Sequence, residues 1–150
     1  MFVHRNIANQ ASPTDLNSLA VIDYAVNALG VRHIIVCGHC GCGGVAAALQ
    51  PTCSGLVSHW LQPLRELAFK HQAELDALTD HDARITRLAE INAIAQAVNI
   101  AASPIVQLAW QAGRPLSVHP WIYELADGLL RDLGAAMDNN ASLHAVCARV

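Results

Sequence analysis

Residues Ile34–Val45 read Ile-Ile-Val-Cys-Gly-His-Cys-Gly-Cys-Gly-Gly-Val, and this stretch decides the fold of the chain. An apolar, β-branched run at Ile34–Val36 meets a cluster of Gly, Cys and His, after which Val45–Leu49 favours helix. This order predicts a buried strand, a tight turn and a helix. Glycines in such a turn accept positive φ and let a ligand approach the backbone closely. The turn is therefore the first place to look for chemistry.

The turn carries His39, Cys40 and Cys42 within four positions. Imidazole and thiolate together suit zinc, which takes nitrogen and sulfur ligands tetrahedrally. One alternative is a small-residue turn with inert, buried cysteines. Another is anion binding by the backbone N–H groups of Gly43 and Gly44, which open a helix. No Lys follows and the full GxxxxGK[ST] pattern is absent, which argues against a nucleotide P-loop.

Composition limits the class of protein. A chain of 150 residues predicts one domain, 1–150, with a proper core. The net charge of −3 and the lack of a basic patch argue against a nucleic-acid partner. No signal peptide follows Met1 and no long uncharged apolar run occurs, so no membrane association is expected. The odd number of cysteines (Cys37, Cys40, Cys42, Cys53 and Cys147) fits a reducing, cytoplasmic location. A disulfide among the first three stays an alternative that would compete with metal.

The first third of the chain predicts a strand, a helix and a second strand. Met1–Asn9 is expected to form a short strand entering a loop. A helix then begins with Ser12 as N-cap and Pro13–Asp15 in its first turn, and Gly30 closes it. The second strand is expected at His33–Cys37. Strand, helix and strand in this order predict a parallel sheet with a crossover helix.

Helices dominate the rest of the expected α/β fold, a mostly parallel sheet flanked by helices. The long helix Arg84–Ala102 is apolar around much of its circumference, which predicts burial against a partner subunit. Residues from about 135 to 150 are expected to be tail-like, with docking through Leu143 and Val146 as the alternative. The other expected segments are helices at Val45–Gln50, Leu56–His71 (broken near Pro63) and Ile105–Gln111, loops at Pro51–Gly55 and Thr79–Ala83, and a strand at Pro115–His119.

Three motifs in this sequence resemble those of the β-class carbonic anhydrases. They are Phe2–Asn9, Gly38–Gly44 and His119–Tyr123, in the order of that family, and the similarity runs from Phe2 to about Gly134. The resemblance implies a β-carbonic-anhydrase-like fold and a zinc-dependent, reversible hydration of carbon dioxide to bicarbonate. It also implies assembly as a homodimer or homotetramer.

The resemblance assigns roles to individual residues. His39 and Cys42 match the family's zinc-binding His-x-x-Cys pair, and Cys40 between them is a bystander or a substitute thiolate. The backbone N–H of Gly43 would hold a substrate oxygen, although the glycine could instead be a steric requirement of the turn. Arg5 and Tyr123 match a pair that binds bicarbonate in one subtype and favours an inactive arrangement. An ordinary salt bridge and a core ring are the alternatives for these two residues.

One family motif, Cys-x-Asp-x-Arg, does not occur in the sequence. In the family its Cys is a zinc ligand, and its Asp/Arg pair gates the metal and orients the nucleophile. Its strand lies between the Phe-Val strand and the Ile-Ile-Val strand, so the resemblance implies an N-terminally shortened fold that lacks the first family strand. Unpaired strand edges are then expected. Three compensations are open: direct pairing of Phe2–Asn6 with Ile34–Val36, another subunit filling the gap, or partial disorder of Met1–Gln10.

Two functions follow, from different classes. The first is a cytoplasmic carbonic anhydrase, a lyase that lacks the catalytic Asp/Arg pair in this sequence. The second is a non-catalytic, shortened relative or fragment that acts as a binding or assembly module. Two zinc ligands are expected to bind weakly, because protein zinc sites normally use at least three. A thiol redox role for Cys40 and Cys42 ranks last, because their spacing is tighter than Cys-x-x-Cys. His33 and the other remaining histidines lack ligand-like neighbours in sequence, and His119 is expected to be structural.

Overall fold

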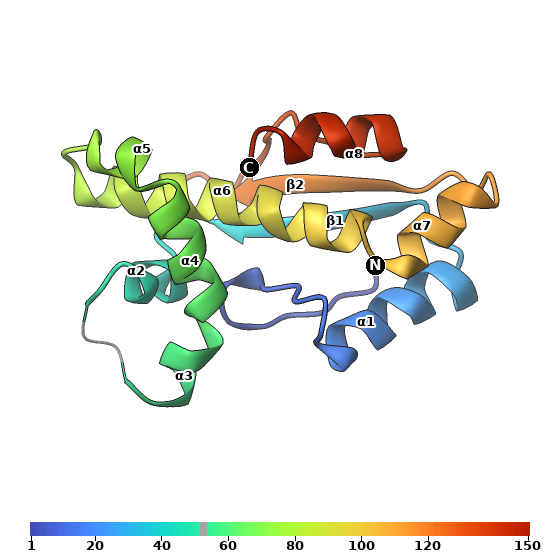
Figure 1. The fold of residues 1–150 in the computed structure, drawn as a ribbon, viewed down its shortest axis with the longest axis horizontal. Coiled ribbons are helices and arrows are strands. Elements are labelled where there is room, and N and C mark those ends of the chain that lie inside the picture. Colours follow the sequence, from blue (N-terminus) through green and yellow to red (C-terminus); the bar gives the residue numbers. More distant parts are fainter. Residues whose placement is uncertain (52–53) are drawn as a thin grey trace.

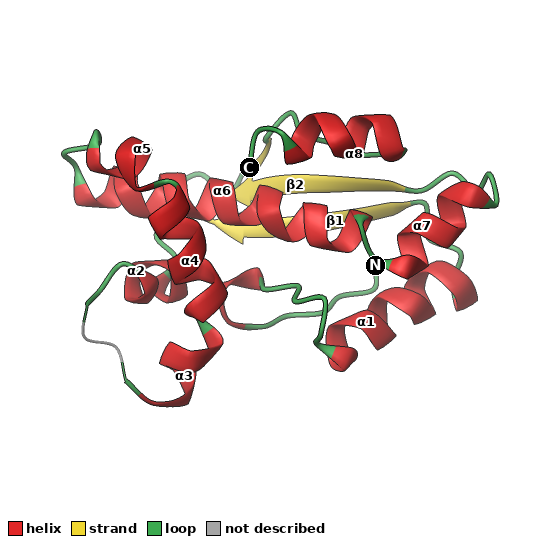
Figure 2. Ribbon diagram, viewed as in Figure 1, coloured by secondary structure: helices red, strands yellow, loops and turns green. Residues whose placement is uncertain are grey.

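The computed structural model describes residues 1–51 and 54–150, so Cys53 and part of the expected loop Pro51–Gly55 lie outside the described residues. Within these ranges the chain is mostly helical, and a small sheet lies among the helices (Figure 2). In chain order the elements are η1 (Ile7–Asn9), α1 (Leu16–Asp23), η2 (Tyr24–Ala28), β1 (His33–His39), α2 (Gly43–Ala48), α3 (Gly55–Trp60), α4 (Gln62–Lys70), α5 (Gln72–Asp76), α6 (His81–Ala101), α7 (Pro104–Gln111), β2 (Ser117–Tyr123), β3 (Leu130–Asp132) and α8 (Asn140–Cys147).

The described strands form one sheet in the order β1-β2-β3. β1 and β2 run parallel, with His33 opposite Ser117 and His39 opposite Tyr123. The short β3 runs antiparallel to β2. A parallel pair needs a long crossover, and the helices α2 to α7 supply it. The predicted α/β fold, a mostly parallel sheet flanked by helices, is confirmed.

The two faces of the sheet differ in burial because side chains alternate along a strand. In β1, Val36 and Gly38 are buried whereas Ile35 and Cys37 are exposed. The inward positions of β2 are all buried, namely Val118, Pro120 and Ile122. Helices cover this inward face, and α6 lies across it (Figure 1). Helices therefore support the C-terminal ends of β1 and β2 from one face of the sheet.

The long helix α6 joins two hydrophobic cores. Its first half packs with α2, α4 and η1 around Leu64 and Leu88, and its second half packs with α7 and α8 around Val106 and Val118. Asp80 caps the helix, since its side chain accepts a hydrogen bond from the Ala83 N–H at 2.8 Å. Other elements of the same chain thus bury the apolar side chains of α6, where burial against a partner subunit was expected.

The expected strand at Met1–Asn9 is wrong. Asn6 and Gln10 exchange two hydrogen bonds of 2.7 and 2.8 Å, which close the chain into the turn η1. Across the described ranges β1 pairs only with β2, so direct pairing of Phe2–Asn6 with Ile34–Val36, one of the three open compensations, does not occur. A strand needs a partner ladder, and residues 6–10 are instead closed by hydrogen bonds within the segment. The disorder considered for Met1–Gln10 does not extend to the hydrogen-bonded part, from Asn6 on.

The first helix starts later than predicted. Asp15, not Ser12, is its N-cap, and the Asp15 side chain accepts from the Asn17 N–H at 3.0 Å. Ser12 Oγ accepts instead from the Thr14 N–H within the preceding turn. Gly30 closes the helical segment with φ +64°, as predicted. The break near Pro63 is confirmed as well, because the predicted single helix divides into α3 and α4. The helices α2 and α7 and the strand after Pro115 lie where predicted, with shifted ends. The long helix α6 begins at His81, inside the loop expected at Thr79–Ala83, and α5 lies where no helix was predicted.

The C-terminal segment is ordered rather than tail-like. Asn139 and Ser142 form a reciprocal capping box at the start of α8. Leu143 and Val146 are buried in the core beside α6 and β2, which is the docking alternative. In the part of the chain that the structure describes, no single helix is long and apolar enough to cross a membrane. α6 and α7 pass that test only as a pair, with a bend of 60° between them.

Candidate metal centre

His39 is the last residue of β1 and is partly buried. Its ring Nδ1 lies 3.0 Å from the backbone carbonyl oxygen of Cys40. Because a carbonyl only accepts, Nδ1 carries the proton of this hydrogen bond and Nε2 keeps its lone pair. A neutral imidazole whose other N–H is held by a carbonyl is the form that binds a metal ion. His39 is therefore arranged to act as a ligand through Nε2.

Cys42 lies at the N-cap of α2 and is 5% exposed. Gly41 turns the chain between the strand and this helix with φ +66°, a conformation that glycine adopts without strain. The Cys42 carbonyl accepts from the Ala46 N–H at 2.9 Å, which fixes the backbone at the start of α2. The predicted strand, turn and helix are confirmed. They carry the imidazole and the sulfur on the two ends of one tight turn.

Gly43 is open on its side-chain side. A Cβ built there meets nothing within 4 Å among the described residues, and its φ is not in the left-handed region. A steric requirement of the turn therefore does not explain this glycine. Gly44 differs, because a Cβ there would lie 3.1 Å from both Ala8 Cβ and Ile7 Cγ2. As the first residue of α2, Gly43 has an N–H without an intrahelical partner. That donor and the open side-chain side of Gly43 both lie directly after Cys42 in the chain.

Cys40 is held differently from the other two side chains. Its N–H donates to the Tyr123 carbonyl oxygen at 3.0 Å and continues the β1-β2 ladder. Burial, and next the neighbouring carboxylate of Glu124, raise the pKa of the Cys40 thiol, whereas Thr86 and Arg131 lower it. These contacts favour the bystander interpretation of Cys40.

A strained turn at Ala8 and Asn9 packs against the candidate metal-binding loop at Gly44, and sequence reasoning missed it. Ala8 and Asn9 both have positive φ, at 59° and 43°, which is uncommon for residues other than glycine. Asn92 of α6 holds this turn, because its Nδ2 donates to the Ala8 carbonyl oxygen at 2.9 Å. Gln10 Nε2 donates to Asn92 Oδ1 at 2.9 Å. Gln96 Nε2 donates to the same oxygen at 3.0 Å. One sequence signal could have indicated this network: two amide side chains, Asn92 and Gln96, lie four residues apart on the apolar face of the predicted long helix.

Arg5 and Tyr123 are not joined in this structure. Arg5 is exposed and forms no hydrogen bond or ion pair with the described residues. Tyr123, 36% exposed, ends β2 directly opposite His39. Tyr123 therefore lies beside the candidate centre, and Arg5 lies on the exposed segment that precedes η1.

A histidine pair lies on the outward face of the sheet. His33 Nδ1 is 3.1 Å from His119 Nε2, and the His119 ring also lies 6.0 Å from that of Trp121, centroid to centroid. Burial, and next the charge of His33, lower the pKa of His119, and Asp132 opposes this shift. Sequence spacing gives His33 no ligand-like neighbour, and the two histidines come together only through β1-β2 pairing.

The centre has two candidate ligands within residues 1–51 and 54–150. No group of three or more His, Cys, Asp or Glu side chains in those ranges is arranged to hold a metal ion. The donor set of His39 and Cys42 fits zinc in kind, one nitrogen and one sulfur. It falls short in number, because zinc sites normally take at least three protein ligands.

Known proteins similar to this chain are carbonic anhydrases. The family model described as carbonic anhydrase matches residues 1–130. The carbonic anhydrase of Emericella nidulans is 46% identical over 133 residues, which cover 89% of this chain and 58% of that protein. The carbonic anhydrase of Candida albicans is 33% identical over 140 residues, which cover 92% and 50%. The chain thus spans roughly half to two thirds of the length of the curated relatives it matches.

Solved structures similar to this chain are described as β-class carbonic anhydrases. A β-carbonic anhydrase of Sordaria macrospora, described as tetrameric, superposes with a TM-score of 0.87 at 43% identity and covers 91% of this chain and 69% of that chain. The β-carbonic anhydrase CafA of Aspergillus fumigatus gives 0.85 at 42% identity, with 97% and 69% covered. The chain belongs to the β-class carbonic anhydrase family.

Proposed function

We propose that this chain carries part of the zinc centre of a carbonic anhydrase, which hydrates carbon dioxide reversibly to bicarbonate. The observation that carries the proposal is the His39 hydrogen bond to the Cys40 carbonyl, which leaves Nε2 free beside the turn that bears Cys42. Family membership supports the reaction. The similarity covers little more than half of some relatives, so the activity is a proposal for the protein to which this chain corresponds.

Each residue of the centre has a definable task. Zinc held there would supply a water of pKa about 7, and hence a nucleophile at neutral pH. His39 would bind through Nε2 while Nδ1–H keeps the ring oriented, and Cys42 would bind as thiolate from a fixed backbone. The Gly43 N–H would donate to a substrate oxygen in the open space beside it. Arg5 and Tyr123 would bind bicarbonate outside the metal's coordination shell, through a guanidinium that suits a planar anion.

A second candidate is a non-catalytic relative that serves as a binding or assembly module. One observation favours it: neither a third ligand in the described residues nor the Asp/Arg pair in the sequence accompanies His39 and Cys42. This candidate predicts an intact fold with little bound zinc.

The proposal also covers the oligomeric state of the chain and its location in the cell. We infer that the chain forms homodimers or homotetramers, which the tetrameric Sordaria relative supports. Exposed apolar side chains such as Phe2 and Ile35 offer surface for such contacts. A reducing, cytoplasmic location is supported by the free thiols of Cys37, Cys40, Cys42 and Cys147.

The test is zinc content by elemental analysis, together with carbon dioxide hydration in the same preparation. We expect His39→Ala and Cys42→Ser each to lower both quantities, with Cys147→Ser as the exposed-thiol control that lowers neither. Zinc unchanged in both variants would overturn the assignment of these ligands. An intact fold with little bound zinc and no hydration would favour the non-catalytic candidate. A loss of zinc in Cys40→Ser would show that Cys40 acts as a substitute ligand rather than a bystander.

A further inference from the structure

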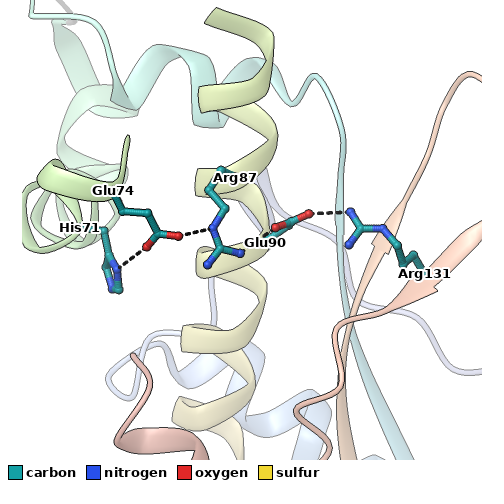
Figure 3. A network of polar contacts seen from close by, with 5 residues as sticks. All are labelled: His71, Glu74, Arg87, Glu90 and Arg131. Carbon is teal, nitrogen blue, oxygen red and sulfur yellow. Dashed lines mark hydrogen bonds and ion pairs between the residues drawn. The ribbon is translucent and has the colours of Figure 1, made fainter. Parts of the chain in front are cut away.

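A row of ion pairs crosses α6 and ends on β3, the strand that pairs with β2. Glu90 of α6 is only 14% exposed and accepts from two arginines, Arg87 Nη1 at 2.8 Å and Arg131 Nη2 at 2.6 Å. Arg87 also donates through Nε to Glu74 Oε1 at 2.6 Å. Figure 3 shows these side chains, together with His71, in one line across the helix. We call this line the Glu90 row.

Arg131 is the member of the row that anchors β3. All three residues of β3 are exposed, so apolar burial does not hold the strand against the helices. Among the described side chains of β3, only that of Arg131 bonds to α6, whereas Asp132 accepts from the Gly134 N–H at 2.8 Å. Leu133 packs against the core just after β3, at the end of the strand away from Tyr123. The ion pair therefore ties the other end of β3, the end beside Tyr123, to α6.

Backbone contacts lead from this ion pair to the His39 ring. Leu130, the residue before Arg131, lies opposite Tyr123 in the β2-β3 ladder. The Tyr123 carbonyl oxygen accepts from the Cys40 N–H at 3.0 Å. The Cys40 carbonyl oxygen in turn lies 3.0 Å from His39 Nδ1, which donates to it. The ion pair thus holds the strand that holds the peptide group to which the His39 ring is bonded.

Electrostatics place Arg131 close to the same turn. Burial raises the pKa of the Cys40 thiol most, and the positive charge of Arg131 opposes that shift. The Cys40 thiol, acting first as a hydrogen-bond donor, lowers the pKa of the Glu124 carboxyl, and the charge of Arg131 lowers it further. The Arg131 guanidinium therefore lies between Glu90 and the residues that follow His39.

We propose that Arg131 and Glu90 are positioning residues of the candidate metal centre. Their ion pair keeps the His39 ring in the orientation that leaves Nε2 free for a metal ion. A carbonyl can orient a ligand's ring only when the carbonyl is itself held in place, and the anchored β3 supplies that support. Neither residue touches the metal or the substrate. This inference deepens the proposed function and rests on it.

The experiment replaces Arg131 with glutamine and follows His39 in the metal-free chain. Glu90 keeps its bond to Arg87 in Arg131→Gln, so no buried charge is left unpaired, and Arg131 is exposed. The variant should therefore fold, which circular dichroism checks. The ¹⁵N shifts of the His39 ring, assigned with His39→Ala, distinguish the Nδ1–H form from the Nε2–H form at about pH 8, where an ordinary histidine is neutral.

Two changes are expected in Arg131→Gln. The unaltered chain should hold His39 in the Nδ1–H form, and the variant should populate both forms. The Cys40 amide should exchange about threefold to tenfold faster, because the loss of one charge-assisted hydrogen bond loosens β3 and the ladder beside it. A purely structural role elsewhere in the fold would leave the ring form of His39 unchanged.

Two further variants locate the effect. Arg84→Gln is the matched control, since it removes a 2.9 Å ion pair of the same helix that leads to Asp76 in α5 instead of β3. It should leave the His39 ring and the Cys40 amide unchanged. Arg131→Lys keeps a positive charge opposite Glu90 and should restore most of the behaviour of the unaltered chain.

Zinc affinity gives a second measurement. Loss of a direct partner of a metal ligand costs about 10–100-fold in affinity. Arg131 lies further out, so we expect Arg131→Gln to lose about threefold to tenfold. An unchanged His39 ring form and Cys40 exchange in Arg131→Gln, or equal changes in Arg84→Gln, would overturn the inference and leave the proposed function intact. Failure of the proposed function is seen separately, as zinc content that His39→Ala does not change.

Discussion

Gly43 and Gly44 are neighbours in the sequence, yet their surroundings differ completely. A Cβ at Gly43 meets open space, whereas a Cβ at Gly44 presses on the strained turn at Ile7–Ala8. We expect Gly43→Ala to change the free energy of unfolding by no more than about 0.5 kcal/mol. We expect Gly44→Ala to be less stable than Gly43→Ala by about 1–2 kcal/mol, because a packed neighbour must move. Urea denaturation of the two variants measures the difference.

If the Gly43 N–H holds a substrate oxygen, the Gly43→Ala and Gly44→Ala variants also distinguish an effect on stability from an effect on the hydration rate. Gly43→Ala would place a methyl group where the substrate approaches, and a misplacement of that size lowers the hydration rate roughly tenfold to a hundredfold. A stable, zinc-containing Gly43→Ala protein with unchanged hydration would show that the open space beside this residue is not the substrate position.

His119 gives a pH-dependent contribution to stability. Its pKa is lowered in the folded chain, first by burial and then by His33, so between the folded pKa and the ordinary value near 6.5 the unfolded chain binds more protons. Stability should therefore rise with pH through that interval and fall as the pH drops below about 6.5. We expect His119→Asn to flatten this dependence, measured as urea midpoints between pH 5 and 8.

The control for this prediction is His59→Gln, which removes an exposed histidine of α3. It should retain the pH dependence. If His119→Asn keeps the full pH dependence as well, another titratable group is responsible. The 3.1 Å contact between the rings of His33 and His119 then does not contribute to the pH dependence of stability.

At the scale of elements, α6 joins the metal-binding loop to the rest of the fold through buried amides. Asn92 is fully buried and bonds to Ala8, Gln10 and Gln96. Replacing it with leucine keeps the branched shape, adds volume and leaves these partners without hydrogen bonds. We expect Asn92→Leu to lower the free energy of unfolding by about 2–4 kcal/mol. Asn17→Leu, at an exposed position in α1, is the matched control and should change it by less than about 0.5 kcal/mol.

Amide exchange adds a sharper measurement. Because Asn92 holds Ala8 and Asn9 at positive φ, its loss should raise exchange at residues 7–11 more than in β2. A uniform increase would show that Asn92 supports the core in general rather than this turn.

Local signals located most elements and the centre of the site. The β-branched run, the glycines and the apolar spacing of α6 are properties of short segments, and they predicted β1, the turn at His39–Cys42 and the long helix. What failed depends on distant partners. Met1–Asn9 has strand-like residues, but no partner strand beside it in the described structure, so local hydrogen bonds prevail. The His33–His119 contact and the Asn92 network likewise arise only when β1, β2 and α6 come together.

At the scale of the whole molecule, the prediction about assembly concerns the free edge of β1 and the outward face of the sheet. β1 has a free edge in the parts of the chain described here, and Ile35 beside it is 46% exposed. A free strand edge next to an apolar face is a ready surface for another chain. If the chain forms homo-oligomers as proposed, Ile35→Lys should lower the mass measured by light scattering on a sizing column. A charge there would have to be desolvated in the interface.

Phe69→Lys is the matched control, since Phe69 is 78% exposed on α4, on the opposite side of the layers from the outward sheet face. It should leave the mass unchanged. Circular dichroism of both variants separates dissociation from unfolding. If Ile35→Lys keeps the oligomer while Phe69→Lys disrupts it, contacts between subunits run through the helical layer. The free edge of β1 would then be available to the additional strand that the family resemblance implies.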